Sequence, residues 1–332
     1  MPVGGKHAPV RPLGPSELAE HRVTATEPDG LDAWWAARIA AARAVAEPVS
    51  LVRHEESAYG PTPVWDVEFS GDGGDRIRGW YLRPAGTEGQ RLPIVVRYIG
   101  YGGGRGLPLD HTLWAAAGYA VLVMDTRGQG AKWAIGATGD PGRSPAGPEY
   151  PGVMTRGISS PETYYYSRLF VDAVRAVDVA SELDGVDPSR IAVSGGSQGG
   201  GLAIAAAALC GDRVRVCHAD IPFLCDFHRA IKITPKAPFT EISDFLAQHV
   251  DLVPAVLETL RYVDCALLAR RITATTLFSA GLMDAVCPPS TVFAAYNEIT
   301  APKEITVSPF GVHDVPRGHI ERQLRHLREH LG

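Results

Sequence analysis

A serine lies between glycines at residues 195–199, where the sequence reads GGSQG. This segment fits the pattern G-x-S-x-G, which would place Ser197 on a tight turn between a strand and a helix. The apolar run at 191–194 predicts a buried strand, and the small apolar residues at 201–209 predict a helix. A hydroxyl at a helix N-terminus can attack a carbonyl, because amide donors and the helix dipole favour the negative charge that develops. The segment therefore predicts a nucleophilic serine, with a chemically silent Gly-rich turn as the alternative.

A nucleophilic serine needs a base, and the base needs an orienting acid that follows the serine in the chain. Asp284 comes shortly after the apolar run at 274–281, and His313 comes just after the run at 304–311. Because the carboxyl ends of parallel strands meet at one edge of an α/β sheet, we expect Ser197, Asp284 and His313 to lie close together. The three residues predict a catalytic triad.

Each member of this triad has an alternative interpretation. Asp284 precedes two prolines and could simply form a turn, since aspartate side chains often bond nearby backbone N–H groups. His313 could be a solvated loop histidine, and His319 is close enough in sequence to compete with it for the role of base. Asp125 also follows an apolar run, but it precedes the serine, and we expect it to anchor the TRGQG loop instead.

A second glycine-rich segment, YIGYGGGRG at 98–106, follows another apolar run. A glycine loop after a strand suggests a dinucleotide-binding site, but no register fits G-x-G-x-x-G: counting from Gly100 the last position is Arg105, and from Gly102 it is Leu107. The loop suits the oxyanion side of a hydrolase site, where the backbone or the side chain of Tyr101 would reach the tetrahedral oxygen. A purely packing role for the Tyr101 ring is the alternative.

Composition narrows the classes of partner. The 332 residues are 45% hydrophobic and carry a net charge of -5 without a basic run, so neither nucleic acid nor a membrane is expected as a partner. The first residues lack the apolar stretch of a signal peptide, which predicts a cytoplasmic protein. The cysteines are odd in number and form no CxxC pair, so we expect free thiols and no metal site. They are Cys210, Cys217, Cys225, Cys265 and Cys287.

The elements that would position these residues follow from the hydrophobic pattern. Apolar runs separated by helix-length segments predict parallel strands buried on both faces, and therefore an α/β fold with a mostly parallel sheet. We expect an extended arm over 1–25, and then one domain over 26–332 that contains a helical insertion at about 222–271, which should cover a sheet edge. The runs lie at 92–100, 119–125, 190–196, 215–222, 274–281 and 304–311, after a helix at 31–46 and a hairpin at 63–85, and a Gly/Pro-rich loop lies at 136–152.

With these residues in place, the sequence resembles carbohydrate esterase family 7, the acetyl xylan esterases that are also cephalosporin C deacetylases. The resemblance covers about residues 25–313 and is carried by RYIGYGGGRG, VMDTRGQG, GGSQGGG and GLMDAVCPPSTVFAAYNEITAPKEI. It implies an α/β-hydrolase fold, Ser197 as the nucleophile with Asp284 and His313, and an oxyanion hole from Tyr101 and the Gln198 backbone amide. Arg127 to Gly130 match the family's RGQG motif. The resemblance also implies a reaction without a metal or an organic cofactor.

The resemblance implies that the substrates are small acetylated molecules and that the chain forms hexamers whose active sites face an internal cavity. One departure concerns the base: His313 is followed by Asp314, where the family usually has glutamate, so the substrate range is expected to differ. Alternatives that stay open are a short-chain carboxylesterase for another ester, a peptidase of the prolyl oligopeptidase type, and a binding protein on a hydrolase fold.

Overall fold

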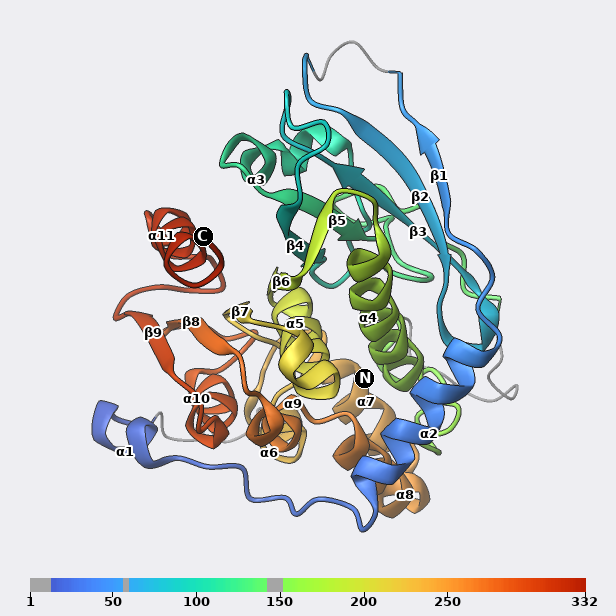
Figure 1. Cartoon of the computed structure of the whole chain (residues 1–332). Helices are drawn as coiled ribbons and strands as arrows, with labels where there is room; N and C mark the ends of the chain where they lie inside the picture. Colours follow the sequence, from blue (N-terminus) through green and yellow to red (C-terminus); the bar gives the residue numbers. More distant parts are fainter. Residues whose placement is uncertain (1–12, 56–59, 142–151) are drawn as a thin grey trace.

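In this computed structural model, which describes residues 13–55, 60–141 and 152–332, nine strands form one sheet (Figure 1). Their order is β1-β2-β3-β5-β4-β6-β7-β8-β9. The first three strands are antiparallel, and the other six are parallel to one another. The strands are β1 Ser50–Arg53, β2 Val64–Ser70, β3 Arg76–Leu82, β4 Leu92–Tyr98, β5 Ala120–Met124, β6 Val186–Gly196, β7 Val216–Asp220, β8 Thr275–Gly281 and β9 Lys303–Ser308.

All six apolar runs of the sequence form the parallel strands, as predicted. β5 and β7 are buried at every position, because helices cover both faces of the sheet and leave no side exposed to water. β2 and β3 form the predicted hairpin, with Val64 opposite Leu82 and Ser70 opposite Arg76. β1 was not predicted from the sequence, since its four residues are all exposed and it lies at the edge beside β2.

Helices lie on both faces of the sheet (Figure 1). α3 and α11 cover one face, where Trp114 and Leu327 are buried with residues of β3 to β7. α4, α5 and α10 cover the other face and hold the larger core. The helices are α1 Pro15–Glu20, α2 Leu31–Ala44, α3 Thr112–Ala116, α4 Tyr165–Glu182, α5 Gln198–Cys210, α6 Phe227–Ile233, α7 Phe239–Gln248, α8 Val253–Tyr262, α9 Cys265–Leu268, α10 Pro289–Glu298 and α11 His319–Leu331.

The N-terminal segment differs from the expected extended arm. Residues 15–20 form the short helix α1, which begins at a proline and whose Glu17 carboxylate accepts a hydrogen bond from the Gly14 amide at 2.7 Å. Leu18 is buried, and the Asn297 amide on α10 donates to its carbonyl at 2.9 Å. The prediction of an extended arm is therefore wrong at residues 15–20. There the buried Leu18 side chain and the hydrogen bond from Asn297 hold a helix against α10. Residues 1–12 lie outside the described residues.

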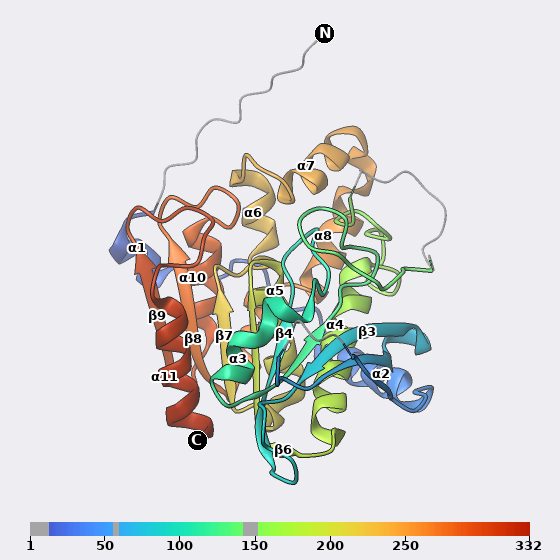
Figure 2. The same ribbon diagram turned by 90° about the horizontal axis from the view of Figure 1, so that it is seen from above.

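The helical insertion is present as α6 to α9, but it does not cover a sheet edge. The edges are formed by β1 and β9, whereas the insertion lies near the carboxyl ends of the parallel strands (Figure 2). There Glu241 of α7 contacts the loop after β4. Of the loop predicted at 136–152, residues 142–151 lie outside the described residues. Within the described ranges, none of the helices combines the length and the apolar character needed to cross a membrane.

Candidate active site

Ser197 lies at the turn between β6 and α5, as the glycine pattern predicts. Its backbone has φ 56° and ψ -119°, a strained conformation that side-chain-bearing residues rarely adopt. Glycines are required on both sides: a Cβ on Gly195 would lie 2.3 Å from the carbonyl carbon of Gly199, and one on Gly199 would lie 2.3 Å from the Tyr98 oxygen. The helix therefore packs directly against the ends of β4 and β6, and this close packing holds the serine on the turn.

Ser197, His313 and Asp284 form one continuous chain of hydrogen bonds. The His313 Nε2 atom lies 2.9 Å from Ser197 Oγ, and its Nδ1 atom lies 2.8 Å from Asp284 Oδ2. The other oxygen of Asp284 accepts hydrogen bonds from the Val286 and Cys287 amides at 2.8 and 2.9 Å. The Asp284 side chain is fully buried, and that of His313 is 26% exposed. This geometry fits proton transfer from the serine to an imidazole that a buried carboxylate orients.

His319 and Asp125, the alternative histidine and aspartate, bind partners outside the triad. His319 begins α11, where its Nε2 atom lies 2.8 Å from Asp220 Oδ1 and its Nδ1 atom lies 3.1 Å from the Thr306 hydroxyl. Asp125 is buried and accepts hydrogen bonds from the amides of Arg105, Thr126, Ala137 and Thr138. It anchors the loops after β4 and β5 to each other.

The Tyr101 hydroxyl binds groups outside the triad. Its hydroxyl lies 2.7 and 2.9 Å from the two carboxylate oxygens of Glu241, and it accepts a hydrogen bond from the Val153 amide at 3.0 Å. Burial raises the pKa of Tyr101 well above its ordinary value, so the hydroxyl stays protonated and can donate to Glu241. If Tyr101 serves the oxyanion hole, as the sequence predicts, its backbone amide is the group available for that role.

The backbone amides of Tyr101 and Gln198 are the candidates for the oxyanion hole. Among the described residues, neither amide donates a hydrogen bond to the protein. The Gln129 side chain links the two segments, because its Oε1 accepts from the Gly102 amide at 2.6 Å and its Nε2 donates to Gln198 Oε1 at 2.9 Å. Gln129 belongs to the RGQG motif, so the sequence singled it out without showing what it binds.

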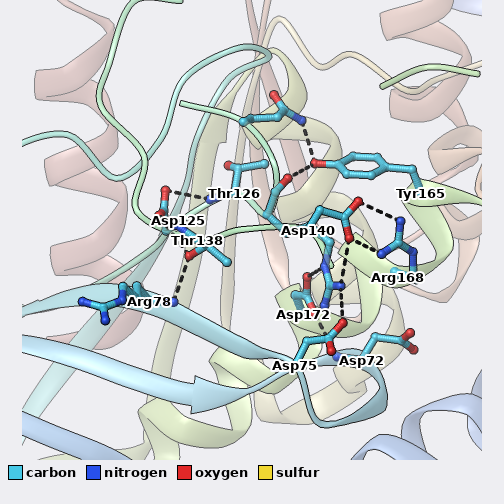
Figure 3. A network of polar contacts seen from close by, with 12 residues as sticks. Asp72, Asp75, Arg78, Asp125, Thr126, Thr138, Asp140, Tyr165, Arg168 and Asp172 are labelled. Carbon is cyan, nitrogen blue, oxygen red and sulfur yellow. Dashed lines mark hydrogen bonds and ion pairs between the residues drawn. The ribbon is translucent and has the colours of Figure 1, made fainter. Parts of the chain in front are cut away.

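The RGQG motif also contributes the buried cation Arg127. Arg127 is fully buried and makes two hydrogen bonds to Asp172, at 2.6 and 2.7 Å, and one to Asp75 at 2.9 Å. Asp140 Oδ1 lies 3.7 Å from the same guanidinium, and Figure 3 shows the side chains of Asp75, Asp140 and Asp172 gathered in this network. The Tyr165 hydroxyl donates to the Arg127 carbonyl at 2.5 Å and accepts from Gln129 Nε2. The network fixes the loop that carries Gln129.

A cavity of about 790 Å³ opens in front of the serine. Ser197 and His313 line it, together with the Tyr101 loop and Pro238 from the insertion. The exposed indole of Trp133 forms part of the wall, and its Nε1 donates to the Tyr101 carbonyl at 2.9 Å. Asp314, where the sequence departs from the family pattern, lines the cavity beside the histidine. The departure therefore lies where it can affect the substrate.

Two residues of the site gave no clear signal in the sequence. Glu241 lies in the insertion, 140 residues from the tyrosine that it binds, so only the fold brings the two together. Cys287 is a free, buried thiol, and its Sγ, a carboxylate oxygen of Asp284 and a ring nitrogen of His313 all lie within 4.8 Å of one another.

Known proteins share this architecture over nearly the entire chain. An acetyl xylan esterase from Paenibacillus sp. R4 is 37% identical, with a TM-score of 0.90 over 96% of this chain and 100% of that one. Acetyl xylan esterase 1 from Thermoanaerobacterium sp. JW/SL YS485 is 32% identical, with a TM-score of 0.88 over 96% of this chain and 99% of that one. Both have the mostly parallel sheet with flanking helices described above.

A curated relative extends the comparison. The acetyl esterase Axe7A of Xylanibacter ruminicola is 29% identical over 292 residues, which are 86% of this chain and 63% of the relative. The chain thus spans less than two thirds of that protein's length. The family model described as acetyl xylan esterase (AXE1) matches residues 11–330. On this match and on its fold, the chain belongs to the acetyl xylan esterase family of α/β-hydrolases.

Proposed function

We propose that this protein is a serine esterase that removes acetyl groups from small acetylated substrates through an acyl-enzyme. The observation that carries the proposal is the unbroken hydrogen-bonded chain from Ser197 through His313 to buried Asp284, which opens onto the cavity. Membership of the acetyl xylan esterase family supports the acetyl group as the acyl part.

In the first half of the reaction, Ser197 Oγ attacks the ester carbonyl while His313 Nε2 takes the hydroxyl proton. Asp284 keeps the imidazole in the required tautomer and stabilises the imidazolium that forms. The amides of Tyr101 and Gln198 donate to the oxyanion, and losing one donor of this kind typically lowers the rate by ~100- to 1000-fold. The imidazolium then gives its proton to the leaving alcohol, and the acetyl group stays on the serine.

The second half repeats the same steps with water as the nucleophile. His313 takes a proton from the water as its oxygen attacks the acetyl carbonyl, and it returns that proton to Ser197 Oγ as acetate leaves. The cavity in front of the serine admits this water, since Ser197 and His313 both line it. The cycle consumes one water for each ester and needs no redox or metal step in this scheme.

The substrates we propose are acetylated xylo-oligosaccharides and cephalosporin C. The names of the two similar solved structures support the first, and the resemblance to carbohydrate esterase family 7 suggested the second. The exposed Trp133 indole in the cavity wall supports a sugar, because aromatic faces pack well against apolar ring faces.

Substrate profiling tests this proposal. We would compare p-nitrophenyl acetate, butyrate and octanoate, and then measure acetate release from acetylated xylo-oligosaccharides and from cephalosporin C. The proposal predicts that acetate is preferred over longer acyl groups and that the sugar esters are cleaved. Cleavage of the simple ester alone would point to a short-chain carboxylesterase for another substrate. Cleavage of peptide p-nitroanilides at comparable rates would favour a peptidase.

Two further properties belong to the proposal. We propose a hexamer, which is supported by large apolar side chains that stay exposed near the site, with Phe310 88% and Met283 60% exposed. A monomer by light scattering would contradict it.

We also propose a cytoplasmic location, supported by five cysteines that are all free, and cell fractionation tests it. Neither nucleic acid nor a membrane surface is proposed as a partner.

A further inference from the structure

Cys287 is a buried thiol that the proposed reaction does not use. It lies three residues after Asp284, and its backbone amide donates to Asp284 Oδ1 at 2.9 Å, which fixes it beside the carboxylate. Only 1% of the residue is exposed. The catalytic centre therefore contains a sulfur donor in addition to the imidazole and the carboxylate.

The three donors are close enough to share one ion. Sγ of Cys287, a ring nitrogen of His313 and an oxygen of Asp284 lie within 4.8 Å of one another. Tetrahedral Zn²⁺ binds sulfur at about 2.3 Å and nitrogen or oxygen at about 2.0 Å, so its ligands lie roughly 3.3–3.8 Å apart. His313 Nδ1 and Asp284 Oδ2 lie 2.8 Å apart, so an ion bound between them would replace their hydrogen bond. The Ser197 hydroxyl, 2.9 Å from His313 Nε2, or a water from the cavity is available as a fourth ligand.

We propose that this centre reversibly binds a thiophilic divalent cation such as Zn²⁺ or Cd²⁺ through Cys287, His313 and Asp284, and that the bound ion inhibits the enzyme. The inhibitory effect rests on the proposed function, whereas the binding does not. On binding, the thiol loses its proton to solvent and the sulfur, nitrogen and oxygen donate to the ion. His313 is then unable to take the Ser197 proton, because the ion either occupies Nε2 or separates Nδ1 from Asp284.

The donor types favour a soft or borderline cation over a hard one. Thiolate and imidazole select zinc-like ions, whereas Mg²⁺ prefers oxygen ligands. The other cysteines offer a contrast, because none of them belongs to a group of three donors among the residues that the structure describes. Cys210 is half-buried and lies at the end of α5, so it provides a matched control thiol.

The inhibition experiment uses p-nitrophenyl acetate with increasing Zn²⁺, Cd²⁺ or Mg²⁺ in a non-chelating buffer. Wild type, Cys287→Ser, Cys287→Ala and Cys210→Ser are each normalised to their own metal-free rate. We expect Zn²⁺ and Cd²⁺ to inhibit wild type and Cys210→Ser, with recovery on adding EDTA. Losing the sulfur should raise the inhibitory concentration at least about 10-fold. Equal inhibition of wild type and both Cys287 variants, or equal inhibition by Mg²⁺, would overturn the proposal.

A binding measurement separates this site from the proposed function. Ser197→Ala retains the cysteine, the histidine and the aspartate, so it should still bind Cd²⁺ and show the ultraviolet absorption of a Cd²⁺–thiolate bond. Adding Cys287→Ser to it should abolish that absorption, and circular dichroism checks that each variant is folded. If the wild type lacks esterase activity but the absorption appears, the function fails and the site stands. If the absorption is absent from folded Ser197→Ala, the site is refuted.

Discussion

At the scale of single residues, the backbone of Ser197 is held in a strained conformation. The neighbouring Gly195 and Gly199 leave no room for a side chain. Strained φ/ψ values persist only where surrounding contacts enforce them. Here the enforcing contact is the approach of α5 to β4, where Gly199 leaves no room for a methyl group. The position of the hydroxyl is therefore sensitive to substitutions that leave the triad itself intact.

Gly199→Ala tests this contact. The new Cβ would lie 2.3 Å from the Tyr98 carbonyl oxygen, which belongs to a central strand that has little freedom to move. We expect the free energy of unfolding to fall by about 1–3 kcal/mol, the usual cost of overpacking, and activity to fall with it. Denaturant unfolding measures the first and p-nitrophenyl acetate hydrolysis the second. Gly139→Ala is the matched control, since a Cβ there meets nothing within 4 Å. Equal behaviour of the two variants would contradict the contact.

Asp284→Asn tests the orienting carboxylate. The amide oxygen can still accept from the Val286 and Cys287 amides, so the fold should survive. An asparagine NH₂ facing His313 Nδ1 selects the wrong imidazole tautomer, which lowers kcat by roughly 10⁴-fold in comparable triads. Steady-state kinetics check this. The control is Asp314→Asn, which changes the exposed aspartate next to His313 and should lower kcat far less. A kcat within tenfold of wild type for Asp284→Asn would remove this residue from the mechanism.

At the scale of elements, the insertion contacts the loop that we propose for the oxyanion hole. Glu241 on α7 holds the Tyr101 hydroxyl, and Glu241 Oε2 also accepts from the Met154 amide at 3.3 Å. Burial raises the pKa of Glu241, and the hydrogen bond from Tyr101 opposes that rise. A contact between an inserted helix and the loop after β4 thus holds the Tyr101 side chain in place.

Tyr101→Phe removes this connection without changing the ring. The loop should loosen, and we expect kcat to fall by about 10- to 100-fold because small misplacements of oxyanion donors are costly, while KM changes little. The Glu241→Gln variant keeps one acceptor for the hydroxyl and should lose less. A tyrosine that only filled space would leave kcat unchanged in Tyr101→Phe, and that result would contradict the positioning role.

Part of the fold and of the candidate site could be predicted from the sequence. Ser197, Asp284 and His313 each follow an apolar run, so the rule that strand ends gather at one edge was enough to place them together. Glu241 could not be found, since no local pattern links an insertion residue to a tyrosine 140 residues away. α1 was missed because its six residues depend on contacts with α10. Tyr101 was identified, but only the fold shows that its hydroxyl binds Glu241.

At the scale of the whole molecule, buried histidines connect the C-terminal helix to the sheet and make stability depend on pH. His218 on β7 and His326 on α11 lie 3.1 Å apart through Nε2 and Nδ1. Burial lowers the pKa of His326 from 6.5 to about 4, with the nearby His330 adding to the effect. Burial also lowers the pKa of His218, helped by its neighbour His326. Both side chains are therefore neutral in the folded protein at pH 7.

These shifts predict loss of stability in acid. A histidine whose pKa is lower when folded than when unfolded contributes its full stabilisation above pH 6.5, and that contribution falls as the pH drops toward 4. We expect the melting temperature to fall over this window. The His326→Gln variant, which keeps a polar side chain, should show a shallower fall. Parallel pH profiles for the two proteins would contradict the assignment.

The most direct test of the central claim, that Ser197 is the nucleophile of an acetyl esterase, is mass spectrometry of the enzyme quenched in acid during turnover of p-nitrophenyl acetate. The account predicts one added acetyl group, mapped by peptide digestion to Ser197, and neither acetylation nor turnover in a folded Ser197→Ala variant. An acetyl group on another residue, or undiminished hydrolysis by Ser197→Ala, would contradict it.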